Sequence, residues 1–294
     1  MTTISATRVA AKRHALSLLA ALATAALLLA PAVVRAQVTL GPTVQSFGVL
    51  AGSTVTNTGP SAVAGNVGVS PGLAITGFPP GTATGTIQSG GATAAQAQTE
   101  LTTAYNTAAG AVCTTNLTGQ DLGGLTLTPG VYCFAASAQL TGNLTLNFLG
   151  DPNANFLFQI GSTLTSASNS NVLATNTGGA GCLPNVNFQI GSSATLGTNT
   201  NFAGNLLALT SITLNTGANL RGRALARNGA VTLDSNLSVG GCPVAPAFVG
   251  GPIPAPGSGT ISPAPTLQEW ALILVGLMLA GMGGWHVRRK GTVR

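Results

Sequence analysis

The sequence predicts a mainly β protein: a parallel β-solenoid built of triangular coils of about 18 residues, with one long α-helix packed alongside. Three observations lead to this fold class. Between residues 126 and 233 the dipeptide Thr-Leu recurs six times, apolar residues alternate with Thr, Ser or Asn around it, and one internal segment changes to a helical period. Alternation indicates strands, and a fixed repeat indicates stacked units that each contact only their neighbours.

The Thr-Leu pairs set the predicted coil length. They begin at Thr126, Thr145, Thr163, Thr195, Thr213 and Thr232, in steps of 19, 18, 32, 18 and 19. We interpret the step of 32 as one coil of 18 with an insertion of 14 around residues 176–182. Gly or Asn interrupts the alternation about every six residues, which predicts three short strands per coil. An early copy of the unit occurs at residues 53–56.

Residues 92–111 are predicted to form the helix, between the early coil and the later units. Thr93 and Gln96 can form a capping box at its start, and Gly110 supplies a stop. Small side chains on its apolar stripe would let it lie close to one face of the solenoid. The stripe consists of Ala94, Ala97, Leu101, Ala104 and Ala108.

Most of the charge lies at the two ends of the chain. The formal net charge is +6, yet only three basic and four acidic residues lie between Gln37 and Pro263. A phosphate-binding surface needs several clustered cations, so the composition of the body argues against a nucleic-acid partner.

Residues 1–36 are predicted to be a secretory signal peptide. A basic start and the apolar run 15–30 precede Val34-Arg35-Ala36, which fits a small-x-small cleavage site. The exported chain would then begin at Gln37. An uncleaved signal anchor is the alternative, although a run of 16 residues is short for a bilayer span, which needs about 20.

The C-terminal end has the opposite layout. Residues 243–263 form a Pro- and Gly-rich linker, which we assign to no domain, and residues 264–294 follow with an apolar segment at 270–287 and a basic tail. The positive-inside rule predicts one transmembrane segment with the body outside the cytoplasm. This end resembles the IPTL-CTERM sorting signals, through Pro265, Thr266, Leu267 and Trp270. The resemblance implies removal of the tail by an exosortase-type enzyme; a plain membrane anchor is the alternative.

Four cysteines occur, all in the body, and an even count in an exported chain suggests two disulfides. Cys113 and Cys133 are 20 residues apart, about one coil, so they can lie on neighbouring coils. We therefore predict Cys113–Cys133 and, by elimination, Cys182–Cys242. Unpaired buried thiols are the alternative.

The body lacks the residues that most catalysis requires. It contains no His and no Lys, and its four acids are scattered. His-based triads and His metal sites are therefore excluded, and we expect no metal and no cofactor. A polysaccharide-cleaving β-helix is the enzyme alternative, but it needs carboxylates that converge on one surface.

What remains is a surface of outward Thr residues. If the Leu of each Thr-Leu pair points inward, the residues on either side of it point outward together. Stacked coils would then present a flat, uncharged file of Thr, whose stiff side chain offers a hydroxyl and a methyl group. The alternative is that Thr is simply a good exposed β residue. The predicted face contains Thr126, Thr128, Thr145, Thr163, Thr165, Thr195, Thr213 and Thr232.

Ordered motifs along residues 40–242 resemble the microbial ice-binding proteins catalogued as DUF3494. They include FGVLAGSTVTNTG at 47–59, GDPNA at 150–154, FQIGS at 158–162 and GRALARNGAVTL at 222–233. The resemblance implies a discontinuous right-handed β-solenoid with a helix alongside, and adsorption to ice through one flat face. Some members carry a Thr-[Ala/Gly]-x-[Thr/Asn] turn near that face. Residues 216–219 fit it, which adds Thr216 to the predicted site.

We therefore expect an exported antifreeze or ice-recrystallisation-inhibiting protein, with domain boundaries at 1–36, 37–242, 243–263 and 264–294. Its partners would be the ice surface, the export machinery and the processing enzyme. Its location would be the cell surface, the outer membrane or the extracellular space, after transient anchoring in the inner membrane. The alternative is a non-catalytic structural or adhesive solenoid without ice activity.

Overall fold

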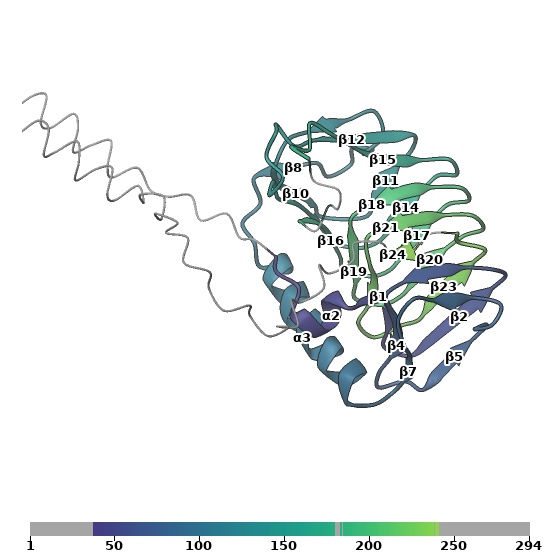
Figure 1. Cartoon of the computed structure of the whole chain (residues 1–294). Helices are drawn as coiled ribbons and strands as arrows, with labels where there is room; N and C mark the ends of the chain where they lie inside the picture. Colours follow the sequence, from purple (N-terminus) through teal and green to yellow (C-terminus); the bar gives the residue numbers. More distant parts are fainter. Residues whose placement is uncertain (1–37, 180–182, 184, 238, 241–294) are drawn as a thin grey trace, which may run out of the picture. The chain divides into compact units, whose positions relative to one another are not determined.

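The computed structural model describes residues 38–179, 183, 185–237 and 239–240, which form a stack of coils with three parallel sheets and a helix alongside (Figure 1). The predicted signal peptide, linker, sorting motif and transmembrane segment lie outside these residues. Within the described part of the chain, no helix is long and apolar enough to cross a membrane.

Each complete coil contributes one strand to each of three sheets. Sheet A contains, in spatial order, β7 (Ile87–Ser89), β4 (Asn66–Val69), β1 (Phe47–Ala51), β22 (Ala224–Ala226), β19 (Asn205–Ala208), β16 (Val186–Ile190), β13 (Phe156–Ile160), β10 (Gly130–Phe134) and β8 (Thr115–Asn116). Sheet B contains β11 (Ala138–Leu140), β14 (Leu164–Ser166), β17 (Ala194–Leu196), β20 (Ile212–Leu214), β23 (Val231–Asp234), β2 (Thr54–Thr58) and β5 (Ala74–Thr76). Sheet C contains β6 (Thr82–Ala83), β3 (Ala62–Ala64), β24 (Val239–Gly240), β21 (Asn219–Arg221), β18 (Asn201–Ala203), β15 (Asn171–Thr175), β12 (Asn143–Asn147) and β9 (Thr126–Leu127). Among the described residues, the remaining elements are the helices α2 (Pro42–Gln45) and α3 (Ala92–Ala109).

The order of coils in space differs from their order in the chain. β1, β2 and β3 of the early coil pair with β22, β23 and β24, which are the last strands of the described residues. The early coil therefore extends the C-terminal end of the stack, with the 66–89 segment outside it. This is the discontinuity that the resemblance implied, and it confirms the predicted fold class.

The predicted coil length holds for only part of the stack. Asn187 pairs with Asn205 and Ile212 with Val231, so the later coils keep the length that the Thr-Leu steps predicted. Earlier coils are longer, because Gly130 pairs with Phe156 and Phe156 with Val186. The prediction of a single insertion was therefore wrong. Extra residues lie in two connections from sheet C to sheet A, at 148–155 and at 176–185, and only the second was predicted.

The interior is filled by stacked side chains from successive coils. The Phe158 and Phe188 rings stack with centroids 4.3 Å apart, and Tyr132 stacks on Phe158 at 5.4 Å. Leu196, Leu214 and neighbouring aliphatic residues close the same core from sheet B. This continuous apolar ladder explains how the chain stays folded with few charges.

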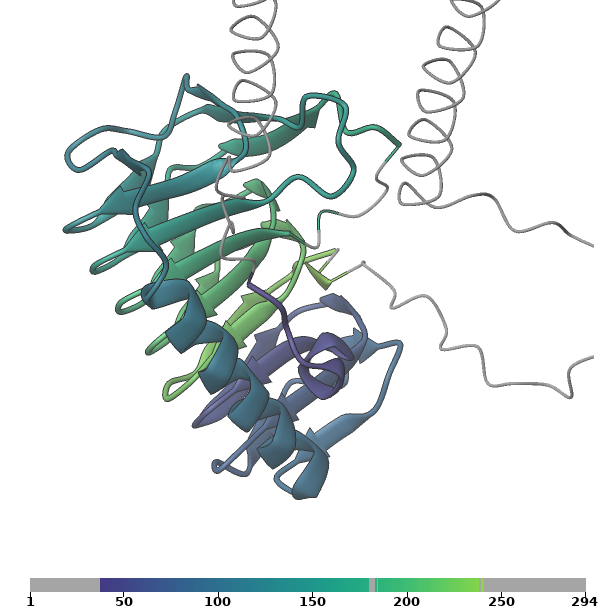
Figure 2. The same ribbon diagram turned by 90° about the vertical axis from the view of Figure 1, so that its left-hand side faces the viewer.

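Helix α3 lies along the outer face of sheet A (Figure 2). Its buried residues are the predicted stripe together with Tyr105, and they pack on Leu50, Leu157, Leu207 and Leu225. Gly110 ends the helix as predicted. The predicted capping box was wrong, because Gly91 is the N-cap and no side chain caps the helix. Gln96 instead donates to Glu100 within the helix, at 3.1 Å.

One predicted disulfide is confirmed. Cys113 and Cys133 are bonded, and the bond ties the segment after α3 to β10 in sheet A. Cys182 and Cys242 lie outside the described residues, so the second bridge stays a prediction.

Candidate functional site

The outer surface of sheet B carries one Thr in the same position on six successive strands. Because the register is continuous, these residues form a straight file, which we call the central file. A glutamine, Gln139, precedes it on β11. The central file consists of Thr165, Thr195, Thr213, Thr232, Thr56 and Thr76.

The local alternation of each strand makes this file point outward. On β20, Ile212 and Leu214 are fully buried and Thr213 between them is half-buried; β23 repeats this with Val231, Thr232 and Leu233. Adjacent strands of a sheet lie about 4.8 Å apart, so the hydroxyl and methyl groups recur at about that interval. The restricted χ1 of Thr keeps them in one arrangement.

Small residues flank the central file on one side. They stand two residues before it in the chain, at the first residue of a strand or directly before it, and the alternation of extended backbone places them on the same side of the sheet. Thr163 donates a hydrogen bond to Ser137 of the neighbouring coil at 2.8 Å. This flanking file consists of Ser137, Thr163, Ser193, Ser211, Ala230, Thr54 and Ala74.

A third file runs along the corner between sheets B and C. Each of its members precedes a residue with a left-handed backbone, and these turn residues are Asn169 (φ 60°), Asn199 (φ 57°), Gly217 (φ 71°), Ser235 (φ 52°) and Gly59 (φ 73°). Backbone hydrogen bonds join each turn to the next, at 2.8–3.1 Å. The corner file consists of Ser168, Thr198, Thr216, Asp234 and Thr58. We call the central, flanking and corner files together the Thr face.

The structure brings most of the predicted Thr residues onto this face, but not all of them. Thr165, Thr195, Thr213 and Thr232 are in the central file, Thr163 in the flanking file and Thr216 in the corner file. Thr163 is not aligned with Thr195 in the sheet. Leu164 pairs with Ala194, so Thr165 is the residue that lies beside Thr195.

Three predicted residues are on a different side of the solenoid. Thr126 and Thr145 lie on strands of sheet C, where they pair with each other, and Thr128 follows β9. The prediction of one common file was wrong for these three. The step of 18 from Thr145 to Thr163 is less than one full turn of the solenoid: it leads from sheet C of one coil to sheet B of the next, and not to the same sheet.

The predicted site also omitted two members of the central file. Thr56 lies on β2 and Thr76 on β5. The Thr-Val-Thr alternation at 54–56 was visible in the sequence. The position of this coil was not, because its neighbour β23 comes from the opposite end of the described chain.

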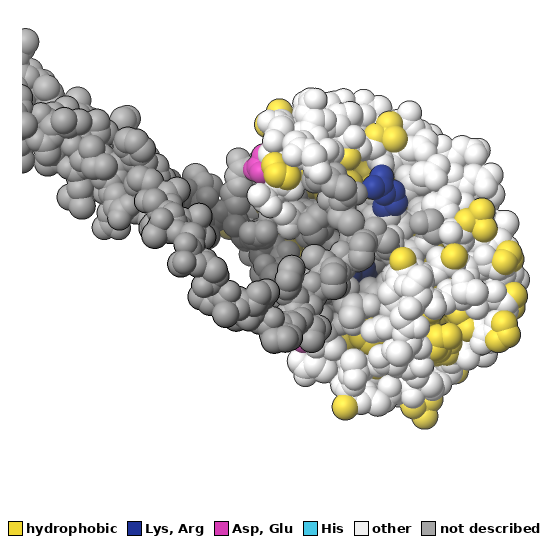
Figure 3. All heavy atoms as spheres, viewed as in Figure 1, with side chains coloured by type: hydrophobic (Ala, Val, Ile, Leu, Met, Phe, Trp, Pro, Cys, Tyr) yellow, Lys and Arg dark blue, Asp and Glu magenta, His cyan; other side chains and the backbone are white. Residues whose placement is uncertain are grey.

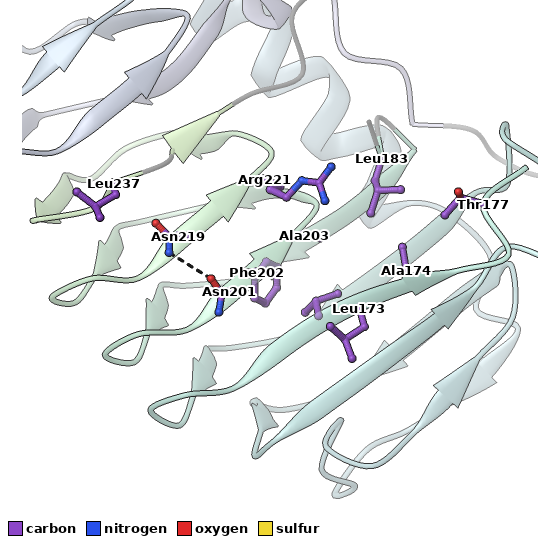
Figure 4. A pocket seen from close by; sticks show the side chains of 11 residues that line it. Leu173, Ala174, Thr177, Leu183, Asn201, Phe202, Ala203, Asn219, Arg221 and Leu237 are labelled. Atoms are coloured by element: carbon purple, nitrogen blue, oxygen red, sulfur yellow. Dashed lines mark hydrogen bonds between the residues drawn. The ribbon is translucent and has the colours of Figure 1, made fainter. Parts of the chain in front are cut away.

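Among the described residues, sheet C offers no comparable file of Thr. Beside Thr145 lies Leu173, and Arg221 lies beside Ala203 in the register of the later coils. A hollow of about 710 Å³ lies over these strands, lined among others by Leu173, Leu183 and Arg221 (Figure 4). The outward amides of Asn201 and Asn219 bond to each other at 3.2 Å in the same view, within a ladder that ties successive coils together.

The four acidic side chains of the described residues lie apart from one another. Three of them accept hydrogen bonds from backbone N–H groups. Glu100 accepts from the Val44 N–H at 2.9 Å and Asp151 from the Asn153 N–H at 2.8 Å. Asp121 accepts from the N–H groups of Gly123 and Thr141 at 2.7 and 2.9 Å. Partial burial favours a higher pKa for Asp121, but these bonds outweigh it and lower the pKa. The described residues contain no group of three or more His, Cys, Asp or Glu that could hold a metal ion.

In the view of Figure 3 the described surface is mainly backbone and uncharged polar side chains, with apolar side chains at several places, a basic group near the middle and an acidic group at the edge. The Thr face is thus a regular array of polar side chains in which, among the described residues, Asp234 is the one charged group, whereas a catalytic cleft needs converging reactive groups.

The sequence matches two known family models. The model of the Ice-binding-like family matches residues 49–239, from β1 to β24. The chain belongs to the Ice-binding-like family. Since the match spans all three sheets, nearly the whole described solenoid is this family's region. The IPTL-CTERM motif matches residues 263–289, which points to export or a cell-surface location with an exosortase-type processing system.

Relatives of this family are similar in sequence and in structure. An ice-binding protein of Nostoc sp. (strain HG1) is 62% identical over 188 residues, which is 64% of this chain and 68% of the relative. Ice-binding protein 1 of Shewanella frigidimarina is 41% identical over 146 residues, 48% of this chain but only 16% of that relative. The crystal structure of an ice-binding protein from an Antarctic biological consortium superposes with a TM-score of 0.66 and 47% identity, and covers 69% of this chain and 91% of that one. That of the Antarctic ascomycete Antarctomyces psychrotrophicus has a TM-score of 0.65 and 37% identity, with 69% and 98% covered.

Proposed function

We propose that this family member is an exported, non-catalytic protein that adsorbs to ice through the Thr face. The observation that carries the proposal is the central file: six Thr side chains in unbroken register on a sheet. Relatives named ice-binding proteins support the activity, and the separation of the acidic residues favours a binding role over catalysis.

Adsorption to ice depends on the order and the charge of the protein surface. Ice is a fixed lattice, so a complementary surface must present its groups at fixed intervals without paying to order them during binding. The strand spacing and the stiff Thr side chain supply that order. The methyl groups favour release of loosely held water, while the hydroxyls hydrogen-bond to water that remains. A charged, flexible side chain would retain its own hydration shell instead.

Two matched variants test which face binds. Thr213→Tyr places a ring in the middle of the central file, and Thr145→Tyr makes the same change in a Thr-Leu pair on sheet C. We expect Thr213→Tyr to abolish most thermal hysteresis and Thr145→Tyr to leave it unchanged. Both should melt close to the wild type, because the two Thr side chains are on the outer side of the sheets and surface substitutions usually change stability by no more than about 0.5 kcal/mol. Loss of hysteresis in Thr145→Tyr but not in Thr213→Tyr would contradict the proposal and would favour a site on sheet C.

The second part of the proposal concerns export and processing. We propose cleavage after Ala36, transient anchoring in the inner membrane through residues 270–287, and removal of the tail by an exosortase-type enzyme. The IPTL-CTERM match supports the processing step. Intact-mass measurement of the surface protein tests it: we expect a chain that begins at Gln37 and lacks Arg288-Arg289-Lys290. A chain that retains this tail contradicts the processing.

A further inference from the structure

We infer that Asp234 limits the ice-binding area of the Thr face: its carboxylate keeps the corner file from joining the central file in contact with ice. This inference rests on the proposed function and concerns how much of the face is used. Nothing in the fold requires an acid at this position, since the equivalent positions on neighbouring coils hold Thr216 and Thr58.

The place of Asp234 in the face follows from the backbone. The Gly217 N–H bonds to the Asp234 carbonyl at 3.1 Å, and the Ser235 N–H bonds to the Thr58 carbonyl at 2.8 Å. Asp234 therefore occupies the corner-file position between Thr216 and Thr58. The coil is shorter here: the left-handed residue comes three positions after Thr232, whereas it comes four positions after Thr213. The carboxylate thus sits close to the central file.

The carboxylate also redirects two hydroxyl groups. Thr216 Oγ1 donates its hydrogen bond to Asp234 Oδ2, and Ser235 Oγ donates to Asp234 Oδ1 at 3.1 Å. Each hydroxyl has a single proton, so neither can at the same time donate to water in front of the face. Within the described part of the chain, Asp234 pairs with these hydroxyls and forms no ion pair with a cation.

An ionised carboxylate opposes contact with ice for a second reason. It binds water strongly, and bringing it against a lattice that accommodates no ions would strip part of that shell without an opposite charge in exchange. The other acidic residues do not act on this part of the face. Asp121 lies beyond the end of the central file, in register with Gln139; Glu100 is on α3; Asp151 is in the 148–155 connection. Asp234 alone, among the acids of the described residues, belongs to the Thr face, where it interrupts the corner file.

Replacement of the acid tests the inference directly. Asp234→Thr supplies the residue type that stands at Thr198 and Thr216, and Asp234→Asn removes the charge but keeps one acceptor oxygen. We expect thermal hysteresis at equal protein concentration to rise about twofold or more for Asp234→Thr, the scale of one exposed charge interaction. Asp234→Asn should show a smaller gain.

Asp151→Asn is the matched control, because it removes the same charge from an exposed turn away from sheet B. It should leave hysteresis at the wild-type value. A melt recorded for each variant separates loss of folding from loss of binding. Hysteresis at or below the wild-type value in both Asp234 variants, with unchanged melts, overturns the inference.

Thr213→Tyr, measured in the same series, separates this outcome from failure of the proposed function. If Thr213→Tyr abolishes the activity and the Asp234 variants do not alter it, only the inference fails. If the wild type and both Asp234 variants show no hysteresis at all, the proposed function and the inference fail together.

Discussion

Adjacent residues of one strand have different roles: one packs in the core and the next belongs to the outer surface. Leu214 is fully buried in the core, while the neighbouring Thr213 belongs to the central file. Leu214→Asn would leave a poorly filled site and bury an amide without a partner, which together should lower the free energy of unfolding by about 3 kcal/mol or more. Denaturant titration measures this loss. A variant as stable as the wild type would show that position 214 does not face the core.

The hydrogen bonds that Asp121 accepts from the backbone should depend on pH. Its pKa is lowered in the fold because the N–H bonds outweigh the opposing effect of partial burial. A lowered pKa means that its contribution is present above the unfolded value, near 3.9, and is lost as the pH falls through the folded value. We therefore expect amide exchange at Gly123 and Thr141 to accelerate on acidification below about pH 4, relative to the intrinsic rate.

Asp121→Asn is the control for this effect. The amide oxygen can still accept a hydrogen bond from one of the N–H groups, but it does not titrate in this range. The relative exchange rates at Gly123 and Thr141 should then be nearly independent of pH. An acid-dependent loss of protection in this variant would assign the effect to another group.

At the scale of elements, helix α3 is held by polar contacts as well as by its apolar stripe. Gln159 from β13 donates to the carbonyls of Ala108 and Ala111 at 2.8 and 2.7 Å, which satisfies the helix end. Tyr105 donates to the Ile190 carbonyl at 3.2 Å and accepts from Gln189. The stripe was predictable because it depends on local spacing. These contacts were not, since their partners lie far away along the chain.

The Cys113–Cys133 bridge fastens the segment after α3, so its removal should act on that end of the stack. Closing a loop of about 20 residues contributes roughly 3 kcal/mol in the chain-entropy account. We expect the double variant Cys113→Ser/Cys133→Ser to melt at a lower temperature and to lose amide protection first around β8 and β10. Thermal hysteresis at low temperature should persist, because the Thr face lies on other strands.

Reductant distinguishes the two predicted bridges. If Cys113–Cys133 is the only disulfide, dithiothreitol has no further effect on the double variant. If Cys182–Cys242 also forms, dithiothreitol lowers its melting temperature again. Equal melting of the wild type and the double variant would show that the first bridge adds no stability.

At the scale of the whole molecule, the sequence predicts the architecture better than the assignment of residues to faces. Alternation shows which side chains point inward, but a triangular coil has three outer faces with the same alternation. Thr145-Leu146 and Thr213-Leu214 are thus equivalent in sequence although they lie on sheets C and B. The early coils are longer than the later ones, so the sequence lacks the fixed period that would have distinguished the Thr-Leu pairs of the two sheets. Thr195, Thr213 and Thr232 were placed correctly because their coils have no insertion.

The stack also depends on pairing between the two ends of the described chain. Val49 pairs with Ala224 and Leu50 with Leu225, and Phe47 packs in the cluster beneath α3. Without residues 38–91, β22, β23 and β24 would become open edges, and the central file would lose Thr56 and Thr76. Open parallel edges promote association between chains, and contacts of such long range form late in folding.

We therefore predict that a chain beginning at Ala92 neither melts cooperatively nor stays monomeric, as measured by circular dichroism and light scattering. Adding the separate fragment 38–91 should restore β-structure and part of the thermal hysteresis, because it supplies the missing strands of all three sheets. The matched control is the same fragment carrying Val49→Asp, which places a charge in the core where β1 joins β22 and should not complement. A truncated chain that melts at the wild-type temperature on its own would mean that the later coils form an independent unit and that the early coil only lengthens the Thr face.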